Sequence, residues 1–150
     1  MQQQLEIVNR KAGFNYELGE KFQAGMILTG TEIKSIREGK VNLSDAFCTF
    51  KGERLMVRNL HISTFTNGNI YNHDPLRLRQ LLLQKREIKK IQTRMKERGL
   101  TLVPTRIYLS ERGLAKIEIA LAKGKKTHNK KESIKEKDIK RETARRLSER

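Results

Sequence analysis

Residues 22–43 constrain the fold most, because they fit a strand, a capped helix and the start of a second strand into a short length of chain. Thr29 and Glu32 have the spacing of a capping box, in which the hydroxyl accepts a hydrogen bond from a free backbone N–H and the carboxylate accepts one in return. Gly39 offers a left-handed residue at which the helix can end. The pattern therefore predicts a short helix between Thr29 and Gly39.

The two sides of this predicted helix differ in character. Ile33 and Ile36 lie one turn apart on one side, which predicts that they pack against the body of the protein. Lys34 and Arg37 lie on another side and form a cationic face. We expect the segment to close one end of a sheet while exposing positive charge.

Alternation of apolar and polar residues predicts six strands, over residues 14–18, 22–29, 42–50, 54–60, 101–109 and 114–121. Gly19 and Glu20 are expected to turn the chain after the first strand, and residues 51–53 to form a hairpin turn. Pro104 cannot donate a backbone hydrogen bond, so it predicts an edge strand or a bulge. Cys48, the only cysteine, is expected to serve as a small apolar side chain within its strand.

A long helix is predicted over residues 75–98, with Asp74 as its N-cap, Pro75 in its first position and Gly99 after its end. The apolar residues that would share one face are Leu78, Leu81, Leu82, Ile88, Ile91 and Met95. Together with the strands, this helix favours a mainly β protein with helices. We expect a small, partly open antiparallel β-barrel with a short capping helix and one long helix at its ends.

The composition changes abruptly after Ala122. Residues 123–150 contain twelve Lys and Arg against five Asp and Glu, with Ile134, Ile139 and Leu147 as their large apolar residues. Such a segment cannot build a core and is expected to be disordered alone. A second capping-box spacing and favourable i,i+4 pairs predict a helix over residues 134–148 when a polyanion neutralises it. We therefore divide the chain into a folded domain, 1–122, and a basic tail, 123–150.

The formal net charge of +16 on 150 residues favours a polyanionic partner, and nucleic acid is the leading class. A membrane surface is the competing polyanion, but it usually requires an apolar face, and the chain has no Trp. The sequence shows neither a signal peptide nor an apolar run long enough to span a membrane. With one cysteine and no possible internal disulfide, a cytoplasmic location is expected.

The motifs of common enzymes are not found in the sequence: it has no phosphate-binding loop, dinucleotide fingerprint or nucleophile elbow. His61, His73 and His128 stand alone, so we expect no metal site and no cofactor. A phosphoesterase that uses two of these histidines as acid and base remains an alternative, because such pairs form in space and not in sequence.

Aromatic residues are too few for extensive base stacking, because several of the eight Phe and Tyr rings must fill the core. Recognition of RNA shape and backbone fits the charge better. Polar side chains that would give specificity are Asn9, Lys11, Glu32 and Lys34. The alternative is that Asn9 and Glu32 are helix caps, and for Glu32 the two interpretations are evenly balanced.

Five segments carry a resemblance to a known family: NRKA (9–12), QAGMILTGTEIKSIREGKVNLSDAF (23–47), DPLRLRQLLLQKREI (74–88), KIEIALAKGKK (116–126) and THNKKESIKEKD (127–138). In this order they resemble the bacterial SsrA-binding protein (SmpB) family over nearly the whole chain. The resemblance implies an OB-like barrel, without catalytic residues or cofactors, that binds the tRNA-like domain of tmRNA as a monomer. It also implies trans-translation: the tail enters the vacant mRNA channel and decoding centre of a stalled ribosome, and the incomplete peptide is tagged for proteolysis.

The resemblance also implies which residues bind RNA. Carried over by position, they are Asn9, Lys11, Gln23, Ala24, Gly25, Arg77, Arg79 and Leu82, the last three at the start of the predicted long helix. Lys34 joins them from the residue-level argument above. Many relatives have Glu in place of Gln23, and the neutral amide keeps an acceptor but loses the charge.

In the tail, the resemblance implies contacts at the decoding site from Gly124, Lys125, Lys126, His128, Asn129, Lys130 and Lys131. The family's usual Asp-Lys-Arg is replaced by residues 129–131, and Lys131 lacks the planar fork of arginine. His128 is the residue expected to stack on an RNA base. The alternative function is a general RNA-binding or ribosome-associated OB-fold protein without preference for a tRNA-like shape.

Overall fold

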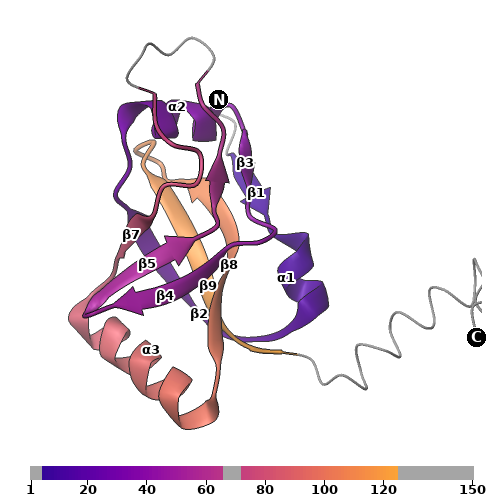
Figure 1. Cartoon of the computed structure of the whole chain (residues 1–150), viewed down its shortest axis with the longest axis vertical. Coiled ribbons are helices and arrows are strands. Elements are labelled where there is room, and N and C mark those ends of the chain that lie inside the picture. Colours follow the sequence, from indigo (N-terminus) through magenta and orange to yellow (C-terminus); the bar gives the residue numbers. More distant parts are fainter. Residues whose placement is uncertain (1–4, 66–71, 125–150) are drawn as a thin grey trace, which may run out of the picture.

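The computed structural model describes residues 5–65 and 72–124, and this part of the chain is mainly β (Figure 1). Its strands are β1 (Glu6–Val8), β2 (Tyr16–Met26), β3 (Val41–Asn42), β4 (Phe47–Lys51), β5 (Arg54–Arg58), β6 (His61–Ile62), β7 (Arg79–Leu82), β8 (Thr101–Leu109) and β9 (Ala115–Gly124). Its three helices are α1 (Arg10–Asn15), α2 (Gly30–Arg37) and α3 (Lys85–Arg98).

Seven strands form one antiparallel sheet that closes on itself. Their order is β1-β8-β4-β5-β7-β2-β9, and β9 also pairs with β8, so the sheet becomes a ring with β1 attached to its side. The shortest pairing in the ring is between β4 and β8, where Cys48 lies opposite Leu102. The mainly antiparallel β fold expected from the sequence is confirmed, as a closed ring of strands.

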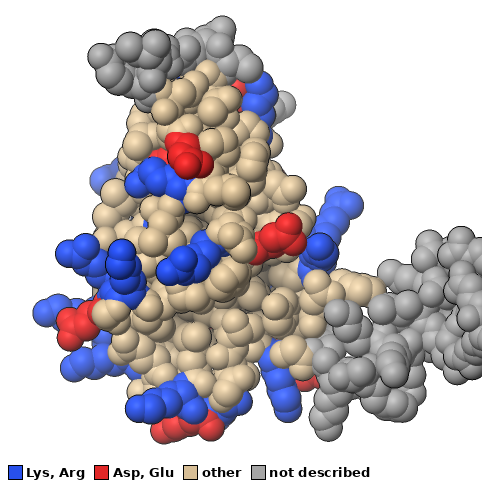
Figure 2. All heavy atoms as spheres, viewed as in Figure 1, with Lys and Arg blue, Asp and Glu red and all other residues tan. Residues whose placement is uncertain are grey.

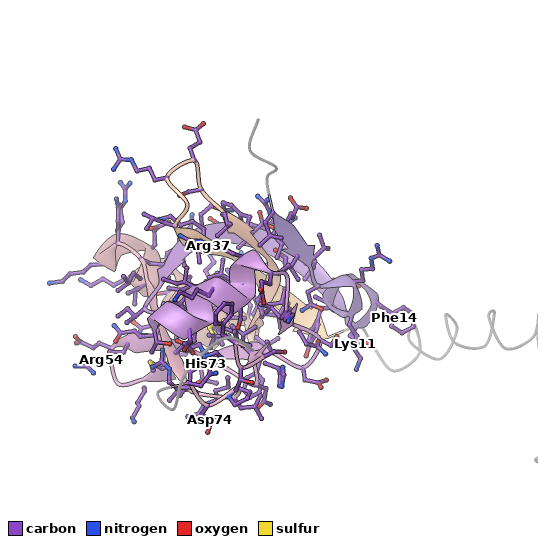
Figure 3. All side chains as sticks on the ribbon, turned by 90° about the horizontal axis from the view of Figure 1, so that it is seen from above. Lys11, Phe14, Arg37, Arg54, His73 and Asp74 are labelled. Carbon is purple, nitrogen blue, oxygen red and sulfur yellow. The ribbon has the colours of Figure 1, made fainter. Side chains whose placement is uncertain are left out.

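The capping box of α2 is confirmed. The Thr29 N–H donates to Glu32 Oε1 at 2.8 Å, and the Glu32 N–H donates to Thr29 Oγ1 at 3.4 Å. Gly39 has the expected left-handed backbone, with φ +75°. Seen from above, α2 lies across one end of the ring (Figure 3), and its fully buried Ile36 faces the core.

One core fills the inside of the ring. Its buried members include Leu55 and Val57 from β5, Leu81 from β7, and Ile117 and Ile119 from β9. Cys48 is buried in β4 as a free thiol, in agreement with the sequence, and burial strongly raises its pKa.

The predicted long helix is wrong in its first half. Leu76 N–H donates to Asp74 Oδ1 at 2.9 Å, so Asp74 caps a turn and not a helix. Residues 79–82 form β7, which pairs with β5 and β2. Burial alternates along β7, with Arg79 and Leu81 inside, and this period of two is incompatible with a helix. The helix begins after Gln84 and ends at Gly99 as expected, with φ +61°.

The predicted strand over 14–18 is confirmed only for residues 16–18, and the predicted turn at Gly19 is wrong. Phe14 belongs to α1, and β2 runs without interruption from Tyr16 to Met26. A Cβ on Gly19 would lie 3.2 Å from the Leu121 carbonyl oxygen. The glycine therefore permits close approach of β9 at a point where the pairing register shifts, and it does not mark a turn.

The predicted hairpin turn and the predicted bulge at Pro104 are confirmed, whereas one predicted strand is two separate strands in the structure. The β4–β5 hairpin turns at Gly52, with φ +65°, as expected. β8 has a register shift after Pro104, which confirms the bulge, although β9 pairs along this strand and it is not a free edge. The predicted strand over 42–50 is split into β3 and β4 by a turn, where the Ser44 N–H donates to Asn42 Oδ1 at 2.8 Å.

β9 continues two residues past the predicted domain boundary. Lys123 and Gly124 pair with Glu17 and Tyr16 of β2, so the end of β9 lies beside the end of α1. The predicted tail helix over 134–148 lies outside the described residues.

Candidate nucleic-acid interface

Outward side chains from four neighbouring strands form a row across the ring. Tyr108 of β8 lies opposite Lys116 of β9, Lys116 lies opposite Gly25 of β2, and Gly25 lies opposite Leu82 of β7. Gln23 is the next outward residue along β2. We call these five residues the outer patch. It brings together three residues predicted from the sequence, Gln23, Gly25 and Leu82.

Gln23 is held at both ends of its amide. Its Nε2 donates to Glu118 Oε1 at 3.0 Å, and the Tyr108 hydroxyl donates to its Oε1 at 2.7 Å. Glu118 also accepts from Thr105 Oγ1 and lies 3.3 Å from Arg106 Nε. Burial raises the pKa of Glu118, but these hydrogen bonds and the Arg106 charge outweigh burial and lower it. The carboxylate beside Gln23 is therefore ionised at neutral pH.

Gly25 keeps space open beside Leu82 and Lys116. A Cβ at this position would lie 3.5 Å from Leu82 Cβ and 3.9 Å from Lys116 Nζ. Leu82 is 50% exposed and so presents apolar surface next to an ammonium group. This combination suits a nucleotide, whose sugar or base packs on the leucine while its phosphate meets the lysine.

Two residues predicted to bind RNA face away from this surface. Ala24 lies between Gln23 and Gly25 on β2, and its side chain therefore points to the opposite side, where it is 1% exposed in the core. Arg79 is fully buried on β7. Its guanidinium donates to Glu32 and to the carbonyl oxygens of Leu60, Asp74 and Pro75. Arg79 is thus part of the structural frame in the free protein.

Asn9 and Lys11 lie at α1. Asn9 is the N-cap: its Oδ1 accepts from the Ala12 N–H at 3.3 Å, and its Nδ2 donates to the carbonyl oxygens of Leu43 and Pro104. The capping interpretation of Asn9 is confirmed. Lys11 is exposed, 3.5 Å from Asp45, at a groove of about 350 Å³ between α1 and the start of β4. Lys11 and Phe14 project from the side of the molecule (Figure 3).

Lys34 and Arg77 lie at the α2 end of the ring and not in the outer patch. The Lys34 ammonium is 5.5 Å from the centre of the Phe65 ring. Arg77 donates to Glu32 through two nitrogens, at 3.2 and 2.7 Å, and remains partly exposed. The capping interpretation of Glu32 is confirmed as well, because its carboxylate accepts a hydrogen bond from the Thr29 N–H at the α2 cap. It also accepts hydrogen bonds from Arg77 and Arg79.

His73 has a structural environment. Its Nε2 lies 2.8 Å from the Ile62 carbonyl oxygen and its Nδ1 lies 2.9 Å from Thr31 Oγ1. Because a carbonyl only accepts, Nε2 carries the proton, and in the neutral ring Nδ1 accepts from Thr31. The buried ring is fully engaged, which argues against His73 as an acid or base. His61 is exposed, and His128 lies outside the described residues.

Helix α3 adds a basic surface immediately after β7. Its cationic residues are Lys85, Arg86, Lys89, Lys90, Arg94, Lys96 and Arg98. Glu20 pairs with Lys90 and Arg94, at 2.5 and 3.2 Å. Figure 2 shows Lys and Arg side chains at the lower left edge of the molecule, where α3 lies in Figure 1.

Sequence reasoning missed Tyr108, Arg106 and Glu118 as neighbours of Gln23. The Arg106 guanidinium lies 4.4 Å from the centre of the Tyr108 ring. Lys116 and Glu118 alternate along β9, but only the pairing of β9 with β2 and β8 reveals which residues they face. Of the predicted tail residues, Gly124 ends β9, and Lys125, Lys126, His128, Asn129, Lys130 and Lys131 lie outside the described residues.

Within residues 5–65 and 72–124, no group of three or more His, Cys, Asp or Glu side chains could hold a metal ion. In the same part of the chain, none of the helices has the length and apolar character needed to cross a membrane.

Comparisons with known proteins give the family. A model of the SmpB protein family matches residues 6–149. The SsrA-binding protein of Cytophaga hutchinsonii is 53% identical over 141 residues, which cover 94% of this chain and 92% of that protein. The SsrA-binding protein of Bacteroides thetaiotaomicron is 52% identical over 144 residues, which cover 96% of each chain. A solved structure described as "tmRNA-SmpB: a journey to the center of the bacterial ribosome" is similar at TM-score 0.69 and 43% identity, over 81% of this chain and 85% of that one. The chain therefore belongs to the SmpB protein family.

Proposed function

We propose that this chain binds the tRNA-like domain of tmRNA and delivers it to stalled ribosomes for trans-translation. The observation that carries the proposal is the family match over residues 6–149, which includes both the folded ring and the basic C-terminal segment. The relatives named above are SsrA-binding proteins, and the similar solved structure concerns tmRNA-SmpB and the ribosome. The chain acts by binding RNA, without a catalytic step or a cofactor.

The ring serves as an OB-like barrel whose outer patch contacts the tRNA-like domain. Lys116 neutralises a phosphate, Leu82 offers an apolar contact, and Gln23 supplies a hydrogen-bond acceptor. Lys11 and Arg77 extend the contact from the two flanking sites, α1 and the α2 end, and Lys34 lies beside Arg77. Asn9, Ala24 and Arg79 support this surface from within, because their side chains are engaged inside the protein.

Residues 125–150, which follow the end of β9, act as a separate functional segment. They carry eleven Lys and Arg against five Asp and Glu, which suits a channel lined by RNA. mRNA that still occupies the channel excludes the segment, so the segment reports a vacant channel. Contacts at the decoding site come from Gly124, Lys125, Lys126, His128, Asn129, Lys130 and Lys131, with His128 stacking on a base.

A competition experiment tests the proposal. The full chain is bound to the labelled tRNA-like domain of tmRNA and challenged with an unstructured RNA of equal length. Preference for the tRNA-like RNA is expected, and equal competition indicates instead a general RNA-binding or ribosome-associated protein. The logarithm of the binding constant is expected to fall with the logarithm of salt concentration with a slope of about several units, because several phosphates are contacted.

A further inference from the structure

Gln23 and Glu118 face each other on adjacent strands, and their hydrogen bond fixes the orientation of the amide. A carboxylate can only accept, so the Gln23 nitrogen must point to Glu118 and its oxygen must point to the Tyr108 hydroxyl. Without the carboxylate, either end of the amide could take either place. Glu118 therefore decides which atom Gln23 presents.

Glu118 is itself held in one position. The residue is 8% exposed, and its carboxylate accepts a hydrogen bond from Thr105 Oγ1 in addition to the one from Gln23. The same carboxylate forms ion pairs with Arg106 Nε and, at 3.8 Å, with Lys21 Nζ. A group with this many donors around it neither rotates freely nor leaves its place without losing several hydrogen bonds. Gln23, by contrast, is exposed at the surface, next to the open space at Gly25.

We propose that Glu118 is a positioning residue for RNA recognition: it orients Gln23 so that the amide oxygen accepts a hydrogen bond from an RNA donor, a 2′-hydroxyl or a base N–H. This inference rests on the function proposed above and adds a residue and an atom to it. Tyr108 occupies the same oxygen in the free protein, and a carbonyl oxygen has a second lone pair for the RNA donor.

Gln23→Glu distinguishes this inference from a simple requirement for negative charge at position 23, because the two predict opposite effects on RNA binding. If a negative charge at this position is what RNA requires, Gln23→Glu should strengthen binding. In this chain the new carboxylate would lie about 3 Å from the ionised Glu118, and two like charges at that distance drive one side chain away or force it to take up a proton. Either change removes the fixed acceptor. Gln23→Glu should therefore weaken binding.

The exchange variant, Gln23→Glu with Glu118→Gln, restores one acid and one amide at the same two places. Its net charge equals that of the wild type, so the non-specific electrostatic attraction of RNA is unchanged. The hydrogen bond between the two residues forms again in the reverse direction, and an oxygen again faces outward. Recovery of binding by this variant would not be expected if Glu118 only stabilised the fold.

The test measures the dissociation constant of the full chain for the tRNA-like domain of tmRNA by fluorescence anisotropy. Gln23→Glu is expected to bind about tenfold more weakly, and the exchange variant to return within about twofold of the wild type. Gln92→Glu on α3 adds the same charge away from the pair and serves as the matched control, with a much smaller effect. Gln23→Met, which removes the acceptor without adding charge, is also expected to lose about tenfold.

Thermal unfolding followed by circular dichroism identifies the folded variants, and the comparison is made among these. Gln23→Glu binding as tightly as wild type or more tightly overturns the inference. So does a folded exchange variant that does not recover, or Gln23→Met binding like wild type. The proposed function fails differently: the wild type itself would then show no preference for tRNA-like over unstructured RNA.

Discussion

Glu32 of α2 and Arg79 of β7 form an ion pair in which both side chains are fully buried. The same carboxylate accepts from Arg77 and closes the capping box with the Thr29 N–H. Arg79 in turn donates to the Leu60 carbonyl oxygen at 2.6 Å. One acidic side chain thus joins the helix that covers the end of the ring to the strand that carries Leu82.

Glu32→Gln is expected to destabilise the protein by about 3–5 kcal/mol, because it leaves the buried Arg79 charge without its partner. Urea unfolding followed by circular dichroism measures the loss. Glu53→Gln, in the exposed turn of the β4–β5 hairpin, makes the same chemical change at the surface and should cost less than about 0.5 kcal/mol. Equal stability of the two variants would contradict a structural role for the pair.

The Glu32 carboxylate is also expected to make the stability of the folded protein sensitive to acid. Burial raises the pKa of Glu32, but hydrogen bonds from Arg77, Thr29 and Arg79 outweigh burial and lower it from 4.5 to about 2. The unfolded chain therefore binds a proton at higher pH than the folded one. The stability that Glu32 contributes is present above about pH 4.5 and is lost as the pH falls toward about 2.

Urea unfolding at a series of pH values across this window checks the prediction. The free energy of unfolding of the wild type should fall more steeply than that of Glu32→Gln, whose residue 32 does not titrate. Glu118 also has a lowered pKa and contributes to both proteins, so the difference between their curves reports Glu32. Parallel curves would show that Glu32 does not titrate with folding.

The sequence predicts α2 well because its signals are local: the cap, the apolar face and the terminal glycine lie within a few residues. It misplaces the start of α3 because Leu78, Leu81 and Leu82 fit a helical face as well as a strand. Arg79 decides the outcome, since its side chain must reach Glu32, which lies far away in the sequence. Long-range partners of this kind leave no local pattern.

For the candidate site, too, some residues can be predicted from the sequence and others depend on long-range strand pairing. The sequence predicts Gln23, Gly25 and Leu82, and strand pairing places them together. It also predicts Ala24, which faces the core because alternation along a strand turns every second side chain inward. It does not predict Tyr108 and Glu118 as parts of the site, because their relation to Gln23 depends on the register of β8 and β9 against β2.

Leu82→Ala is expected to weaken binding of the tRNA-like domain about fivefold with little change in stability, because Leu82 is 50% exposed and its apolar surface is free for a partner. Leu76→Ala is the matched control: Leu76 is 55% exposed but lies in the turn before β7. Fluorescence anisotropy gives both affinities, and thermal unfolding gives both stabilities. Similar affinities of the two variants would remove Leu82 from the interface.

Truncation after Gly124 should separate the two proposed activities. It keeps the pairing of Lys123 and Gly124 with β2, whereas truncation after Ala122 removes these two pairs and should be less stable. The shorter deletion removes eleven Lys and Arg and five Asp and Glu, so the salt dependence of RNA binding should become less steep.

Preference of this truncated chain for tRNA-like over unstructured RNA should persist, because Gln23, Gly25, Leu82 and Lys116 all remain in place. Tagging of incomplete peptides on stalled ribosomes, measured in a reconstituted translation reaction, should be lost because no segment is left to enter the mRNA channel. A chain that keeps tagging would show that the segment is dispensable. A chain that loses RNA preference while remaining folded would place recognition partly in residues 125–150, since the outer patch is unchanged.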